Sequence, residues 1–230
     1  KEGRVVAGDV LVRRGRIEKV AREIPAGRVD RIIDAGGKYL LPGFIDDQVH
    51  FREPGLTHKA TISTESAAAV AGGITSYMEM PNTIPNVTSR PVLMDKYRLA
   101  RGRSHANYSF YFGAANDNLD EIRGLRPGDC CAVKMFMGSS TGNMLVDNPA
   151  TLERIFAECP MLIATHCEDT PMIKANEERF RQQYGDEVPF SAHPQIRSPE
   201  SAYKSSELAV SLAKRHNARL HVLHLSTARE

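Results

Sequence analysis

The chain has 230 residues, of which 41% are hydrophobic and 25% are charged, as in an ordinary globular protein. It contains no run of about 18 apolar residues, which argues against a membrane-spanning helix. The 30 Lys and Arg residues nearly balance the 28 Asp and Glu residues and leave a formal net charge of +2. Because the basic residues are also scattered, neither nucleic acid nor a membrane surface is an expected partner.

Residues 1–40 carry glycine-punctuated apolar alternation, as in Val10–Val12 and Ile17–Val20, which predicts short strands and a small all-β piece. The four cysteines form no C-x-x-C pair, so neither a disulfide framework nor a cysteine zinc site is expected, and a reducing cytoplasm fits best.

From Leu41 onward, strand-like apolar runs alternate with stretches of helical periodicity. The predicted strands cover residues 44–50, 74–80, 108–112, 133–137, 161–166 and 220–225. The predicted helices include 64–70, 91–101, 151–158 and 199–216, the last after the start signal Ser198-Pro199. This alternation predicts an α/β protein with a parallel sheet, and about six such units favour a (β/α)8 barrel.

The length does not suffice for such a barrel, which needs eight strands and about 250 residues. Residues 41–230 supply about six strands, and the chain stops at Glu230 where a helix is due. We therefore expect a fragment whose barrel is incomplete at its C-terminus, because an unclosed barrel leaves two strand edges unpaired.

Polar residues gather where the first predicted strand ends. Side chains two apart on a strand share a face, so Asp46, Gln48, His50 and Arg52 are expected to project together. A single histidine beside an apolar run is usually a hydrogen-bonded structural residue. Other predicted strands, however, also end in residues with ligand or binding chemistry.

These residues are Asn82 after the second strand, Lys134 within the fourth, His166 at the end of the fifth and His224 late in the sixth. Active sites of (β/α) barrels lie at the C-terminal strand ends, and converging neutral imidazoles indicate a metal site. A charged lysine facing a barrel interior is costly unless it is paired or modified. Lys134 is therefore expected either in a buried ion pair or as a carboxylated lysine that bridges two metals.

The chain resembles dihydroorotases of the amidohydrolase superfamily. The segments that carry the resemblance are residues 42–46, 49–55, 80–83, 133–136, 164–166 and 221–227. The resemblance implies a (β/α)8 barrel with a small β domain from flanking segments. Residues 1–40 would then be the N-terminal part of a small β-sandwich domain, and residues 41–230 the catalytic barrel.

The resemblance also implies a ligand set for one or two Zn²⁺ ions. His50 would bind one metal, a carboxylated Lys134 would bridge, and His166 and His224 would bind the second metal. The aspartate that acts as general acid and base would lie beyond Glu230.

Arg52 and Asn82 would hold the carboxylate of the substrate, and this pair favours a dihydroorotase over related hydantoinases and allantoinases. The first-strand motif departs from the family pattern, because Gln48 stands where the first histidine of His-x-His is usual. A carboxamide oxygen is a weaker zinc ligand than imidazole, so the metal site shared with His50 is expected to be looser or partly empty.

The implied activity is the reversible conversion of N-carbamoyl-L-aspartate to L-dihydroorotate in pyrimidine biosynthesis, by a cytoplasmic homodimer. Two alternatives stay open. One is a related cyclic amidase of the hydantoinase, dihydropyrimidinase or allantoinase type. The other is a non-catalytic, dihydroorotase-like structural partner of aspartate transcarbamoylase, which Gln48 makes credible.

Overall fold

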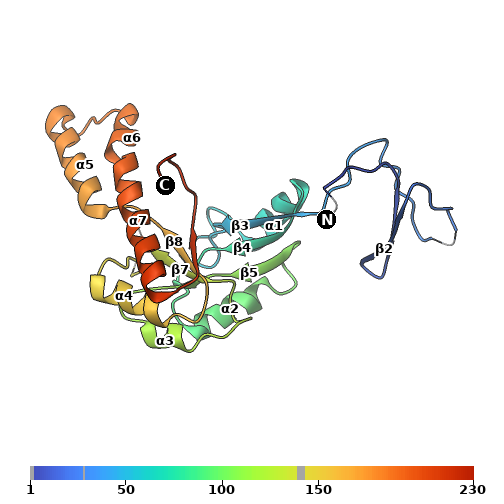
Figure 1. Cartoon of the computed structure of the whole chain (residues 1–230), viewed down its shortest axis with the longest axis horizontal. Coiled ribbons are helices and arrows are strands. Elements are labelled where there is room, and N and C mark those ends of the chain that lie inside the picture. Colours follow the sequence, from blue (N-terminus) through green and yellow to red (C-terminus); the bar gives the residue numbers. More distant parts are fainter. Residues whose placement is uncertain (1–2, 28, 139–142) are drawn as a thin grey trace. The chain divides into compact units, whose positions relative to one another are not determined.

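The computed structural model describes residues 3–27, 29–138 and 143–230, which divide into two compact units, Lys1–Pro42 and Gly43–Glu230 (Figure 1). The first unit contains an antiparallel hairpin of β1 (Asp9–Arg13) and β2 (Arg16–Ala21). Both residues of its two-residue loop have positive φ, 50° at Arg14 and 71° at Gly15, as a type I′ turn requires. The strands lie where the apolar alternation predicts them; a β-sandwich around them stays a prediction.

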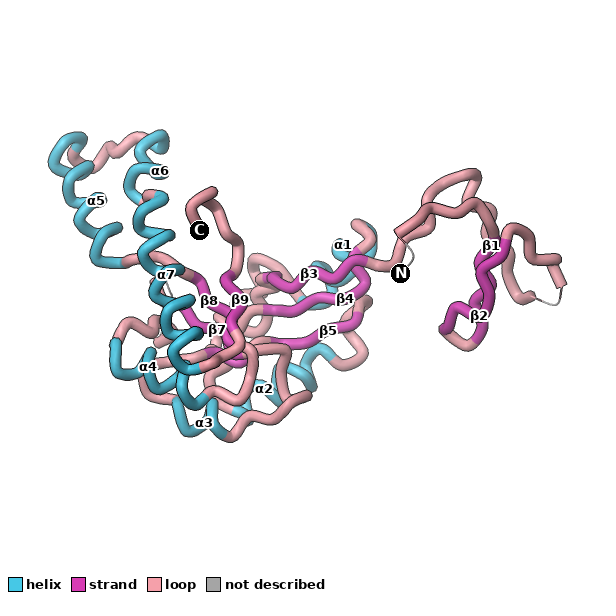
Figure 2. The backbone as a smooth tube through the Cα atoms, viewed as in Figure 1, coloured by secondary structure: helices cyan, strands magenta, loops and turns pink. Residues whose placement is uncertain are grey.

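The second unit is built on parallel strands in two sheets (Figure 2). The strands are β3 (Phe44–Val49), β4 (Ile74–Glu79) and β5 (Asn107–Phe110) in one sheet, and β6 (Phe112–Gly113), β7 (Val133–Phe136), β8 (Ile163–His166) and β9 (Leu220–Val222) in the other. Every pairing among them is parallel, which confirms the predicted α/β class.

The third predicted strand, 108–112, is divided between the two sheets. Only Tyr111 separates β5 from β6. The Cys131 amide donates to the Phe110 carbonyl at 3.1 Å, and the Phe112 amide donates to the Ala132 carbonyl at 3.0 Å. The chain therefore passes directly from one sheet to the next. The described strands of this unit form two sheets, and closure into a barrel stays a prediction.

Helices follow most strands. They are α1 (Ile62–Ala71), α2 (Arg90–Ala100), α3 (Leu119–Arg123), α4 (Pro149–Glu158), α5 (Thr170–Tyr184), the 3₁₀ helix η1 (Phe190–Ala192), α6 (His193–Ile196) and α7 (Pro199–His216). The hydroxyl of Ser198 caps α7 at the predicted start by accepting from the Ser201 amide. No helix in the described parts of the chain has the length and apolarity to cross a membrane.

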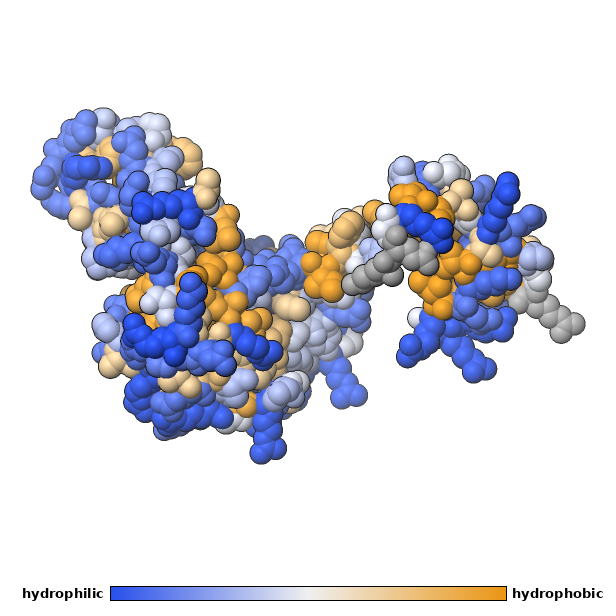
Figure 3. All heavy atoms as spheres, in the orientation of Figure 1, coloured by the Kyte–Doolittle hydropathy of each residue, from blue (hydrophilic) through white to orange (hydrophobic). Residues whose placement is uncertain are grey.

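Strand alternation separates two buried faces. Val133 and Met135 of β7 belong to the large apolar core, which includes residues of α2, α4 and α7. Ala132 belongs to a smaller cluster on the opposite face, and Lys134 shares that face by its spacing of two residues. Figure 3 shows a largely hydrophilic surface over α5, which buries only Ile173 and Phe180.

Candidate metal and substrate site

The predicted site residues lie at the carboxyl ends of the parallel strands. His50 follows β3 directly, Asn82 lies in the loop after β4, His166 ends β8 and His224 lies just after β9. Lys134 lies within β7, which pairs with β8. Because parallel strands end at one edge of a sheet, these side chains belong to the same end of the unit.

His50 is held by Asn82. Its Nδ1 lies 2.9 Å from the Asn82 Oδ1. A carboxamide oxygen only accepts, so Nδ1 carries the proton and Nε2 keeps its lone pair. Burial, together with the positive charges of Arg52, Lys134 and Lys96, lowers the pKa of His50 to about 4. The ring is therefore neutral near pH 7, as a metal ligand must be.

A buried ion pair supports this side of the site. Lys96 of α2 lies 3.1 Å from Glu79 of β4, and its Nζ also donates to the Met80 carbonyl at 3.0 Å. Burial raises the pKa of Glu79 to about 7 and lowers that of Lys96, while their attraction opposes both shifts. Sequence reasoning missed the pair. The available signal was a lysine at the apolar spacing of Leu93 and Ala100 on one helix face.

Arg52 lies on a fixed loop. Its backbone has φ of 69°, which is uncommon for a residue other than glycine. The next residue, Glu53, is buried, accepts from the Ile62 amide at the start of α1 at 2.8 Å, and pairs with Arg103 at 2.8 Å. The Arg52 side chain forms no hydrogen bond or ion pair with the described residues, so its guanidinium is available to an anion.

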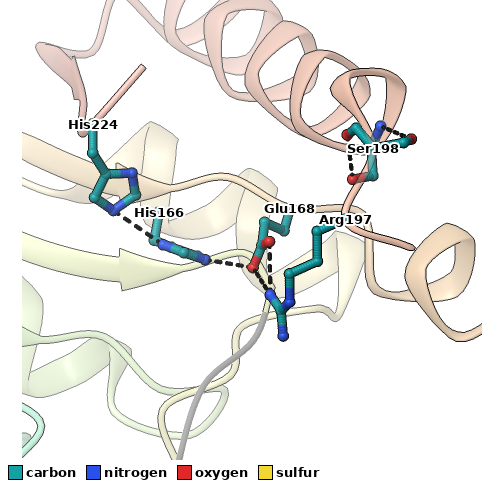
Figure 4. A network of polar contacts seen from close by, with 6 residues as sticks. His166, Glu168, Arg197, Ser198 and His224 are labelled. Atoms are coloured by element: carbon teal, nitrogen blue, oxygen red, sulfur yellow. Dashed lines mark hydrogen bonds and ion pairs between the residues drawn. The ribbon is translucent and has the colours of Figure 1, made fainter. Parts of the chain in front are cut away.

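On the other side of the site, two imidazoles face each other (Figure 4). His166 Nδ1 lies 3.1 Å from His224 Nε2, and the rings meet edge to face at 71°. Burial and the neighbouring His166 and Lys134 lower the pKa of His224. Zinc–nitrogen bonds of about 2.0–2.1 Å place two tetrahedral nitrogen ligands about 3.3 Å apart. The separation of these two nitrogens therefore fits one shared metal ion.

The second ring nitrogen of His166 contacts the carboxylate of Glu168. His166 Nε2 lies 2.8 Å from Glu168 Oε2, and Arg197 Nη1 lies 2.7 Å and 2.5 Å from the two carboxylate oxygens. Sequence reasoning missed Glu168 and Arg197, because their pairing joins the end of β8 to the α6–α7 junction. Gly138 lies against this point, since a Cβ there would be 2.2 Å from the Glu168 carbonyl oxygen.

Lys134 is almost completely buried, with 1% of its surface exposed. Its Nζ has no hydrogen-bond partner within the described residues and lies 4.3 Å from the centroid of the Phe136 ring. Burial lowers its pKa to about 7. The expected alternative of a buried ion pair therefore does not hold for the described part of the chain. Carboxylation of Lys134 stays a prediction.

The predicted residues form two groups, His50 with Asn82 and His166 with His224. The charge of Lys134 lowers the histidine pKa in both groups. No cluster of three or more His, Cys, Asp or Glu side chains arranged for a metal occurs in residues 3–27, 29–138 and 143–230. The Gln48 backbone amide donates to Asp46 Oδ1 at 3.0 Å, and binding of metal by the Gln48 side chain stays a prediction.

The unit thus has parallel strands with histidines at or just after three strand ends and a buried lysine within β7. Residues 37–114 match the family described as Dihydro-orotase-like. A dihydroorotase of Methanosarcina acetivorans is 36% identical over 95% of this chain and 46% of its own length. An allantoinase of Streptomyces avermitilis is 35% identical over 95% of this chain and 49% of its own length.

The L-hydantoinase structure from Arthrobacter aurescens superposes with a TM-score of 0.86 at 29% identity, over 95% of this chain and 49% of that one. The chain is thus similar to the dihydroorotase-like family over residues 37–114, and over nearly its whole length to relatives named dihydroorotase, allantoinase and L-hydantoinase. It spans about half the length of the curated relatives that it matches.

Proposed function

We propose that the full-length protein is a zinc-dependent dihydroorotase, which interconverts N-carbamoyl-L-aspartate and L-dihydroorotate in pyrimidine biosynthesis. The observation that carries the proposal is the facing pair of His166 Nδ1 and His224 Nε2, 3.1 Å apart, together with a buried lysine whose Nζ has no hydrogen-bond partner among the described residues. Two relatives, at 36% and 33% identity to this chain, are dihydroorotases.

The donor set fits a metal centre. His166 and His224 would hold one Zn²⁺, and a carboxylated Lys134 with His50 Nε2 would hold a second, which Gln48 would bind weakly. A buried amine with a pKa near 7 is largely neutral at slightly alkaline pH, and the neutral amine is the form that combines with CO₂. When bound, zinc would supply Lewis-acid activation of water and of the ring carbonyl.

The β3–β4 side would bind the substrate. Asn82 uses its oxygen on His50, so its amide N–H groups remain as donors for a carboxylate. Arg52 would add a bidentate guanidinium contact. Together these two side chains would orient the ring against the metal-binding end of the strands. This orientation is the part of catalysis that the chain itself provides.

We also propose the arrangement of the whole protein. The barrel would close in the full-length chain, and residues 1–40 would contribute to a small β-sandwich. The protein would act in the cytoplasm as a homodimer, as the resemblance implies.

The test is zinc content by elemental analysis of the full-length protein, beside turnover of dihydroorotate with and without added zinc. Dihydrouracil and hydantoin, which lack the carboxylate, serve as comparison substrates. We expect bound zinc and a preference for dihydroorotate. Preferred turnover of the carboxylate-free rings would support the hydantoinase alternative. The similarity to the L-hydantoinase of Paenarthrobacter aurescens, at 28% identity, favours that alternative.

A full-length protein with no bound zinc and no turnover would instead support the second alternative, a non-catalytic partner of aspartate transcarbamoylase. Gln48 in place of a ligand imidazole favours this second candidate.

A further inference from the structure

We propose that Glu168, held by Arg197, is a positioning residue for the zinc site: it fixes the His166 ring in the orientation and tautomer that present Nδ1 to the metal. The inference rests on the proposed function, since it concerns zinc at His166 and His224. It assigns a purpose to a carboxylate that neither the sequence motifs nor the resemblance singled out.

The hydrogen-bond pattern determines the tautomer. An ionised carboxylate only accepts, so the 2.8 Å contact between His166 Nε2 and Glu168 Oε2 requires a proton on Nε2. The lone pair of the neutral ring then lies on Nδ1, and Nδ1 is the atom that faces His224. Carboxylates behind metal-binding histidines fix ring orientation and raise the basicity of the ligand nitrogen.

Arg197 holds the carboxylate in place. Its Nη1 contacts both Glu168 oxygens, at 2.7 Å and 2.5 Å, and it lies between α6 and the Ser198 cap of α7 (Figure 4). The Arg197 amide donates to the His193 carbonyl at 2.9 Å. The guanidinium is thus delivered from a junction with a defined backbone, and a charge-assisted contact of this kind is strong.

The Glu168 backbone is equally constrained. The next residue, Asp169, caps α5 by accepting from the Met172 amide at 3.0 Å, and its own amide donates to the Ser201 carbonyl at 3.0 Å. From the other side, Gly138 approaches so closely that a Cβ would meet the Glu168 carbonyl oxygen at 2.2 Å. Glu168 is therefore placed by β8, α5, α7 and the segment after β7.

The chain contains a matched control. Glu153 of α4 contacts His216 Nε2 at 2.5 Å and also pairs with Arg215. This histidine–glutamate–arginine group repeats the chemistry of His166, Glu168 and Arg197. It joins α4 to the C-terminal end of α7, and the proposed zinc site uses neither helix as a source of ligands. The variant E153Q removes the same charge from a comparable group.

The experiment compares wild-type full-length protein with E168Q, E168A and E153Q. Zinc affinity is measured by competition with a chromophoric chelator. The His166 tautomer is read from two-bond ¹H–¹⁵N spectra of the metal-free protein. We expect the Nε2–H tautomer in the wild type, a zinc Kd raised about 10–100-fold in both Glu168 variants, and a change below about twofold in E153Q.

Each outcome decides a separate point. A wild-type protein that binds no zinc contradicts the proposed function. The His166 tautomer is measured on the metal-free protein, so it tests the role of Glu168 independently of zinc binding. An Nδ1–H tautomer of His166 in the wild type overturns the inference, even if the variants fail to fold. Folded E168Q with wild-type zinc affinity, or E153Q that weakens zinc as much as E168Q does, also overturns it.

Discussion

The two sides of the candidate site hold their histidines differently. On the β3–β4 side, the neutral carboxamide of Asn82 orients His50, and the first-strand position next to it is Gln48. On the β8–β9 side, His166 faces a second imidazole and is backed by a carboxylate. We propose that this difference corresponds to two roles: the β8–β9 side would provide most of the metal affinity, and the β3–β4 side would bind and orient the anion.

The largest expected effect is on zinc binding. H166A removes a nitrogen from the facing pair and should weaken zinc by at least about 100-fold, more than the loss of an outer partner does. H50A should weaken the same site by no more than about tenfold. Chelator competition on both variants measures the ratio. Equal losses would remove the distinction between the two sides.

The two buried lysines give stability effects of opposite sign. K96M strips the partner from buried Glu79 and should cost about 3 kcal/mol of unfolding free energy. K134M removes a buried amine that has no hydrogen-bond partner in the part of the chain that the structure describes, and should stabilise the metal-free protein by about 1–3 kcal/mol while abolishing turnover. Urea unfolding measures both. Destabilisation by K134M would mean that the amine has a partner in solution.

The K134M gain should depend on pH. The folded pKa of Lys134 is about 7, below the ordinary 10.5, so the unfolded chain binds the additional proton between these values. Wild-type stability relative to K134M is therefore highest above about pH 10.5, is lost as the pH falls toward 7, and is constant below that. A flat difference over this range would contradict the lowered pKa.

A smaller effect concerns the substrate carboxylate. R52M should raise KM for dihydroorotate at least about 10–100-fold, because it removes charged hydrogen bonds to the substrate carboxylate, and should leave dihydrouracil kinetics nearly unchanged. Steady-state kinetics on both substrates separates the two effects. Equal losses on both rings would show that Arg52 supports the loop and does not read the carboxylate.

Q48H tests the weaker side of the metal site directly. The added imidazole should increase zinc on the His50 side and raise the zinc content of the protein toward two ions per chain, because imidazole binds zinc better than a carboxamide. Q48N, which keeps the carboxamide, is the control. Elemental analysis after dialysis distinguishes them. An unchanged zinc content in Q48H would place residue 48 outside the coordination sphere.

The smallest expected effect on stability and zinc affinity is at His221, an exposed residue that lies three positions before His224. It contacts Asp47 at 3.5 Å. H221Q should change stability by less than about 0.5 kcal/mol and leave zinc affinity unchanged. Thermal unfolding and chelator competition measure both. A marked loss of zinc would show that His221, and not only His224, faces the metal.

Much of the fold follows from local sequence patterns. Apolar runs located β3, β4, β7, β8 and β9, and the start of α7 was predicted from Ser198-Pro199. Helix α5 was missed because only Ile173 and Phe180 of its 15 residues are buried, so no apolar stripe marks it. Helix α3 spans five residues, which is too short for periodicity to show.

Those site residues that lie in strands or at strand ends could be predicted from the sequence. Lys134 and His166 lie within strands, where alternation places them, whereas His50 and His224 follow the strand ends, and His224 has a φ of 36° that alternation does not predict. The side chains that hold these residues could not be predicted from local patterns, because the contacts of Glu168 with Arg197 and of Glu79 with Lys96 join segments distant in sequence. Metal coordination by the predicted set, including Gln48, stays a prediction.

Gly138 has a consequence for genetic variation. The smallest side chain at this position would collide with the main chain of Glu168. In a random mutagenesis screen, substitutions at Gly138 should therefore score with those of the histidines, while changes at Gly124, which is exposed and has an ordinary φ of -75°, should score as silent. A map of mutational tolerance would then show Gly138, a loop residue without a functional side chain, as sensitive as the residues of the site.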